Sequence, residues 1–241
     1  LTGDGHRMAL ALGADVANMS EGLGIPGLTL PGAERATYAF WSFMPDLPGI
    51  FVNIKGRRFV DEFTFYDWKN TELLAQPEAR CFSVFDDAMR KLGVGRIVAG
   101  FSEDLEKEVS EGVVLKADTV AELAQKMGVP ADAFEETVAT WNADAAAGVD
   151  RQFGRTAALS PISTPPFYAF ETFSTMFDNS GGLKINAKAQ VVNVWGNVIP
   201  RLYAAGATAG GVMGEHYPGS GTAVITGLTF GRIAGKNAAA E

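Results

Sequence analysis

The chain has 241 residues, of which 47% are hydrophobic and 20% charged, enough apolar material for a sizeable core and an argument against disorder. Its net charge of -8 at pH 7 disfavours nucleic acid and anionic membrane surfaces as partners, and no uninterrupted apolar stretch is long enough to span a membrane. A single cysteine, Cys81, excludes an intrachain disulfide, and no Cys/His cluster has zinc spacing, so we expect a cytoplasmic protein without a structural metal site.

The opening residues predict a loop, Thr2 to Gly5, that runs into a short helix ended by Gly13. The chain starts on Leu1 without a starting methionine, and natural domains seldom begin on a loop of this kind. We therefore expect that the true amino terminus lies upstream of this sequence.

Glycine and proline recur every few residues from 22 to 48, which predicts irregular loops there. The letters from Gly22 to Gly27 match the dinucleotide-binding fingerprint, but no strand precedes them and Pro26 would interrupt the helix that should follow. We reject this match. Further along, β-rich runs around a polar glycine turn predict a hairpin over residues 50–60, and Cys81 to Phe85 predict a strand.

The helices of the central part carry local signals. An aspartate after the strand that ends at Phe85 can cap a short helix, and Thr119 with Glu122 has the spacing of a capping box. A longer helix is predicted from Pro130 to Gly148. Its apolar residues form one stripe, which we interpret as core and not as a ligand site: Phe134, Val138, Trp141 and Ala145.

The last third changes to strands and turns, followed by a helix over residues 222–239. Strands are predicted at 167–173, 183–186, 190–194 and 202–205. Gly227, Gly231 and Gly235 fall on one face of the helix, which predicts a neighbour that comes close. The small residues from 206 to 211 follow a strand, and the loop 214–221 leads into the helix, an arrangement that suits either an anion or carbonyl ligand or a purely structural tight turn.

Five phrases, in order along nearly the whole chain, closely resemble the FAD-dependent fumarate reductase and ketosteroid dehydrogenase superfamily. They are Thr2–Ala9, Val52–Glu62, Gly181–Asn186, Leu202–Gly206 and Phe230–Gly235. The resemblance implies an α+β fold, in which a cap domain of the fumarate reductase flavoprotein type is flanked by parts of an FAD-binding α/β domain. Residues 19–171 would be the cap, whereas 1–18 and 172–241 would belong to the FAD-binding domain.

The same resemblance implies FAD as the cofactor of the intact enzyme. The nucleotide-binding half that precedes these residues in the family would lie upstream of Leu1, and we expect the present chain alone to hold no flavin. The residues that match FAD-contacting positions are Asp4, Asn179, Gly206, Ala207, Thr222 and Ala223. The family often has glutamate where Ala207 stands, so one polar contact to FAD is in doubt.

The residues expected to meet the substrate resemble the ketosteroid dehydrogenase branch. Where the fumarate reductase branch has arginines that clamp dicarboxylates, this chain has Tyr66 and Tyr217. The resemblance implies Tyr66 as a base, with Tyr217 and the Gly221 N–H as donors to a ketone oxygen. A core role for Tyr66 is the alternative.

We therefore expect part of a flavin-dependent oxidoreductase acting on a carbon–carbon bond next to a carbonyl, with an apolar enone or ketone as substrate. One alternative is a reductase of an unsaturated carboxylic acid, with Arg35, Arg57 and Arg58 supplying a carboxylate site. Another is a non-catalytic fragment that binds no flavin.

Overall fold

The computed structural model describes residues 2–28, 37–38, 49–93, 101–214 and 216–241. The chain divides into two compact units. The central unit is Gly24–Thr175, and the flanking unit combines Leu1–Leu23 with Met176–Glu241. The predicted mixture of helices and strands is confirmed, whereas the assignment of residues 19–171 to a cap stays a prediction.

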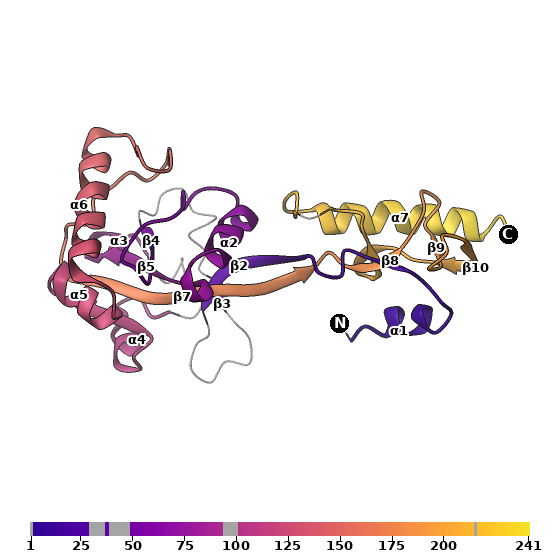
Figure 1. Cartoon of the computed structure of the whole chain (residues 1–241), viewed down its shortest axis with the longest axis horizontal. Coiled ribbons are helices and arrows are strands. Elements are labelled where there is room, and N and C mark those ends of the chain that lie inside the picture. Colours follow the sequence, from indigo (N-terminus) through magenta and orange to yellow (C-terminus); the bar gives the residue numbers. More distant parts are fainter. Residues whose placement is uncertain (1, 29–36, 39–48, 94–100, 215) are drawn as a thin grey trace. The chain divides into compact units, whose positions relative to one another are not determined.

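A β-sheet whose neighbouring strands are mostly not consecutive in the sequence forms the middle of the central unit (Figure 1). In the described residues its strands follow the order β3-β2-β7-β5-β4, and β6 also pairs with β7. The strands are β2 (Gly22–Leu28), β3 (Thr37–Tyr38), β4 (Ile50–Asn53), β5 (Arg80–Asp86), β6 (Val114–Ala117) and β7 (Phe167–Asn179). Each of the pairs β4–β5, β5–β7 and β6–β7 is antiparallel, with Val84 opposite Ala169 in the central pair.

Both faces of this sheet are covered, because neighbouring side chains of β4, β5 and β7 enter different cores. In β5, Phe85 belongs to one apolar cluster and Val84 to the other. The first cluster includes side chains of α2 (Tyr66–Leu74), α3 (Asp87–Lys91) and the residue before α4 (Glu106–Ser110). The second includes side chains of α5 (Val120–Met127) and α6 (Ala131–Ala147).

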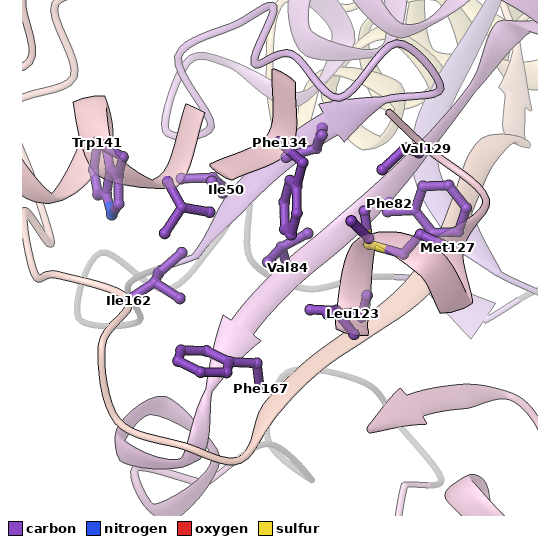
Figure 2. Close-up of a cluster of buried hydrophobic side chains, with 14 of the residues drawn as sticks. Ile50, Phe82, Val84, Leu123, Met127, Val129, Phe134, Trp141, Ile162 and Phe167 are labelled. Atoms are coloured by element: carbon purple, nitrogen blue, oxygen red, sulfur yellow. The ribbon is translucent and has the colours of Figure 1, made fainter. Parts of the chain in front are cut away.

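The predicted signals of α3, α5 and α6 are confirmed. The Asp86 side chain accepts a hydrogen bond from Met89 N at 3.0 Å, and both halves of the Thr119–Glu122 capping box are present. Figure 2 shows Phe134 and Trp141 of α6 pointing into the second cluster, where both are completely buried. The apolar stripe of α6 is therefore core, as its periodicity predicts.

The prediction of irregular loops is wrong for the start of residues 22–48, because Gly22–Leu28 form strand β2. The rest of that segment, except the short strand β3, lies outside the described residues. Pairing with β7 overrides the local signal of the glycines. At Gly24 a side chain would collide with the Asn70 carboxamide, since an added Cβ would lie 2.0 Å from Asn70 Nδ2. The rejected dinucleotide fingerprint is thus part of a sheet.

The hairpin predicted over residues 50–60 forms only in part. Asn53 accepts from Gly56 N at 2.9 Å and donates to Arg57 O at 2.9 Å, which closes the predicted turn. The returning run makes a single bridge, Val52 to Arg58, and no strand. Strand β4 pairs along its length with β5 instead. A one-turn 3₁₀ helix, η2 (Pro77–Ala79), precedes β5.

The flanking unit contains small sheets and two helices (Figure 1). Its elements are α1 (Asp4–Leu10), β1 (Val16–Ala17), β8 (Gly182–Lys184), β9 (Gln190–Val192), β10 (Val198–Tyr203), η4 (Gly206–Thr208), β11 (Ala209–Gly210) and α7 (Thr222–Ala238). Strand β8 lies between β1 and β11, and β9 pairs with β10. The start of α1 at Asp4 corrects the prediction that Asp4 and Gly5 belong to a loop.

Helix α7 differs from the helices of the central unit because none of its residues is buried. Val224, Ile225 and Leu228 are 66%, 58% and 66% exposed. Of the three glycines aligned on this helix, Gly227 lies against Gly206, where an added Cβ would be 3.5 Å from the Gly206 Cα. Gly231 and Gly235 have no such neighbour among the described residues. The predicted close approach is therefore confirmed at Gly227 alone.

Candidate functional site

The candidate cofactor residues of the flanking unit gather around Ala207. Three hollows of the described part of this unit share Ala207 in their linings. One also contains Asn179, Gly206 and Ala223, and another contains Asp4. The hollows thus bring together residues that are far apart in the sequence, from the start of α1, from η4 and from the start of α7.

The start of α7 supplies backbone donors to this region. Its N-cap residue, Gly221, has a left-handed backbone (φ 93°), and no side chain caps the helix. The first N–H groups of a helix have no partner inside the helix, and the helix dipole places partial positive charge there. Because Ala223 and Thr226 line the first hollow, this end of α7 favours a negatively charged or electron-rich group.

Close backbone packing holds the strands under the hollows. An added Cβ at Gly182 would lie 2.6 Å from Thr208 O, and one at Gly210 would lie 2.2 Å from Gly182 N. Asn179 Oδ1 accepts a hydrogen bond from Gly181 N at 2.6 Å, which orients the carboxamide beside the same strands. The sites at Gly182 and Gly210 therefore require glycine, as expected where backbone must approach backbone closely.

Not all predicted residues lie on these hollows. Thr222 and Gly221 start α7 without appearing in the three linings. Tyr217 lies in the loop that precedes α7 and is buried, with 8% of its surface exposed. Asp4 does line one of the hollows, as an exposed residue at the first turn of α1 that accepts from the Thr2 hydroxyl at 2.6 Å.

Several lining residues were not among the predicted ones. His6, Asp178 and Met19 line a hollow that also contains Asn179 and Gly181, while Thr226 and Phe230 line the hollow that contains Gly206 and Ala223. A helical-periodicity argument from Ala223 would have found the last two, because positions 223, 226 and 230 share one face of a helix. The approach of His6 to Asn179 depends on folding and leaves no local signal.

Tyr66 belongs to the central unit, where it is the first residue of α2 and is buried. Its ring lies 4.2 Å, centroid to centroid, from that of Phe65. No side chain caps α2, whose N-cap residue is Phe65. The position of Tyr66 thus depends on how the preceding residues are held.

A buried cluster of charged side chains holds the segment that precedes Tyr66. Arg58 donates to Glu62 at 2.9 and 2.8 Å and to Asp150 at 3.1 and 3.0 Å. Arg155 donates to Glu62 at 3.2 Å, and Glu62 also accepts from Phe51 N at 3.0 Å. Burial by itself lowers the pKa of Arg58, but the bonds to both carboxylates outweigh burial and raise it. Arg58 is therefore fully engaged inside the protein.

This result weakens the predicted carboxylate site. Arg58 is buried and paired, and Arg57 pairs on the surface with Glu136. Arg35 lies outside the described residues. The remaining argument for an acid substrate comes from relatives and not from these two arginines.

Lys69 of α2 is completely buried beside the cluster. Its Nζ donates to the backbone oxygen of Glu62, and the Phe51 ring centroid lies 5.9 Å away. Burial lowers the pKa of Lys69 to about 7, against the opposing effect of Glu62 and Asp61. Among the described residues the Lys69 ammonium makes no ion pair, and the nearby carboxylates of Glu62 and Asp61 only partly offset the cost of its burial.

The described residues include no group of three or more His, Cys, Asp or Glu side chains placed to hold a metal ion. Among the helices they form, none combines the length and the apolarity needed to cross a bilayer.

The chain is similar to flavoproteins over almost its whole length. It is 34% identical to NADH:acrylate oxidoreductase of Vibrio harveyi over 99% of this chain and 23% of the relative, and 33% identical to the fumarate reductase (cytochrome) of Shewanella frigidimarina over 98% and 39%. A crystal structure of 3-ketosteroid delta1-dehydrogenase from Sterolibacterium denitrificans, in complex with 1,4-androstadiene-3,17-dione, matches with a TM-score of 0.86 and 28% identity, covering 100% of this chain and 47% of that one. The chain thus spans less than half the length of each of these proteins.

The family described as FAD binding domain matches residues 1–224. This match covers both units, including all the residues that line the hollows around Ala207 apart from Thr226 and Phe230. The chain therefore belongs to the FAD binding domain family, together with fumarate reductases and ketosteroid dehydrogenases.

Proposed function

We propose that this chain is the cap and the carboxyl-terminal FAD-contacting part of an oxidoreductase that acts on a carbon–carbon bond adjacent to a carbonyl. The observation that carries the proposal is the gathering of small residues, Asn179 and the uncapped start of α7 around Ala207. Family membership and the relatives' activities support the same reaction class.

The residues around Ala207 fit a flavin. Gly206, Ala207 and Ala223 leave room for a flat ring, since none of them carries more than a methyl group. Backbone N–H groups at the start of α7 would donate to the electron-rich edge of the ring, and Asn179 would offer a polar contact. FAD, when bound, would supply the acceptor or donor of a hydride.

Two tyrosines would handle the substrate's protons and charge. Tyr66, as its phenolate, would accept the proton from the carbon next to the carbonyl and become the neutral phenol, acting as a general base. Tyr217 and the Gly221 N–H would donate hydrogen bonds to the carbonyl oxygen, whose negative charge grows during the reaction. The burial of Tyr217 supports its role as a donor, because a hydrogen bond to a developing charge is stronger where water is excluded.

An apolar enone or ketone is the substrate class that we favour. A tyrosine cannot supply the positive charge that would pair with a dicarboxylate, whereas bidentate arginines recognise carboxylates best. A reductase of an unsaturated acid is the second candidate, supported by the similarity to acrylate and fumarate reductases. Turnover of a steroid enone against that of fumarate distinguishes the two candidates.

The remainder of the FAD-binding domain would complete the enzyme. The chain spans only 23–39% of the two curated relatives given above, and α7 exposes three large apolar side chains. We propose that the nucleotide-binding half of the domain is the partner of this chain and that the loaded enzyme contains both.

The test is Tyr217→Phe in the protein that carries both halves and FAD. This change removes one hydrogen bond and keeps the ring. The expected loss in the rate of flavin reduction, measured anaerobically in a single turnover, is about a hundred- to a thousandfold. A melting curve of both proteins is the control for stability. An unchanged reduction rate with a ketone substrate would remove Tyr217 from the mechanism.

A further inference from the structure

The start of α2 is fixed by a lysine and not by a cap. Lys69 N donates to Phe65 O at 3.0 Å, and the Lys69 side chain reaches further back to Glu62 O. Tyr66 lies in the stretch from Glu62 to Lys69 that the side-chain bond closes. No side chain caps α2, and the Lys69 ammonium holds this turn in another way, by donating to a backbone oxygen of the segment that precedes the helix.

The attachment point itself is immobilised. Both Glu62 carboxylate oxygens accept hydrogen bonds, one of them from Phe51 N on β4 and the other from Arg155 at 3.2 Å. Glu62 is completely buried. Lys69 therefore ties the first turn of α2 to a residue that the sheet and the charged cluster hold in place.

We propose that Lys69 is a positioning residue for Tyr66, and that the protonation state of its amine sets the orientation of the Tyr66 phenol. An ammonium has three donors, and the described residues provide Lys69 with one acceptor, Glu62 O. Loss of the proton weakens this bond, because a neutral amine is a poorer donor than an ammonium. The groups that face Lys69 are Glu62, Asp61 and Arg155, together with the Phe51 ring.

The Lys69 amine gains or loses its proton within a pH range in which the folded protein can be studied. Burial lowers the pKa of Lys69 to about 7, so the amine changes charge near neutral pH. The inference rests on the proposed role of Tyr66 for its functional meaning. Its test does not, because the orientation of Tyr66 is measurable in the chain without flavin or substrate.

The experiment is a pH titration of the full 241-residue chain labelled with ¹³C at the tyrosine Cζ. The Tyr66 resonance is assigned with Tyr66→Phe. We expect it to shift with a midpoint of about 7, together with the Lys69 side-chain resonances. In Lys69→Met the Tyr66 resonance should be displaced and should lose this titration.

Lys126→Met is the matched control. The Lys126 ammonium also donates to a backbone oxygen, that of Lys116, but on the surface, so this variant should keep the wild-type titration of Tyr66. A Tyr66 resonance that stays constant while Lys69 titrates, or one that is the same in wild type and Lys69→Met, would overturn the proposal. Should Lys69→Met fail to fold, the wild-type titration alone decides. Failure of the proposed function is recognised separately, as unchanged turnover in Tyr66→Phe.

Discussion

Lys69→Met should change how the stability of the chain depends on pH. The side chain is completely buried, and burial lowers its pKa from 10.5 to about 7. The difference of ~3.5 corresponds to about 5 kcal/mol at about 1.4 kcal/mol per pH unit, the energy needed to keep the amine protonated in the fold. Methionine has a similar length and no charge, so the variant lacks this cost at every pH.

The sign follows from proton binding. Between pH 7 and 10.5 the unfolded chain keeps the Lys69 proton and the folded chain loses it, so stability rises with pH in this window. Below pH 7 the folded protein carries the full cost. Relative to Lys69→Met, wild type should therefore gain about 2 kcal/mol from pH 7 to about pH 8.5.

Urea unfolding followed by tryptophan fluorescence at pH 6, 7, 7.75 and 8.5 provides the measurement. The series stops at pH 8.5 because burial raises the pKa of the Cys81 thiol well above 9.0, which makes stability fall at higher pH. Lys126→Met should run parallel to wild type. Parallel curves for wild type and Lys69→Met would refute the reasoning, since they would mean that Lys69 binds its proton equally in both states.

Three further predictions concern the 241-residue chain by itself. The purified chain should be colourless, without flavin absorption in the visible spectrum; a yellow solution would contradict this. Amides of residues 119–146 should exchange slowly in the absence of FAD, because the Phe134 side of α6 belongs to a core within the central unit; fast, uniform exchange there would show that this core needs the cofactor. Gly182→Ala should lower the melting temperature, because an added Cβ would lie 2.6 Å from Thr208 O, whereas Gly231→Ala on α7, with no neighbour within 4 Å, should stabilise the chain by up to ~1 kcal/mol.

Local signals in the sequence predicted α3, α5 and α6 of the central unit but neither α2 nor α4. The Thr119 capping box and the stripe through Trp141 depend on residues three or four positions apart, so both can be recognised without a fold. Strand β2 could not be predicted in this way, because its residues form a strand only by pairing with β7. The two strands are far apart in the sequence: Thr175 Oγ1 of β7 donates to Ile25 O of β2, 150 positions away.

The site was predictable to a similar extent. The family resemblance named Asn179, Gly206 and Ala223 as candidates, and the structure brings these three into one lining; their role toward a cofactor stays a prediction. The charged cluster was missed, because Arg58 and Asp150 are 92 positions apart and no local sequence pattern near either residue indicates that the two form a pair. The attachment of Lys69 to Glu62 O was missed for another reason: a lysine on a nine-residue helix usually points to solvent, and only the packing of the sheet buries it.

Helix α7 has a practical consequence for work with this chain. A helix of 17 residues that presents Val224, Ile225 and Leu228 to water offers a ready contact for other copies, because apolar surface is driven out of water wherever it can be covered. We expect reversible association that fades on dilution and grows with ammonium sulfate. Association of folded chains adds to apparent stability by mass action, so melting temperatures of variants are comparable only at matched, low protein concentration.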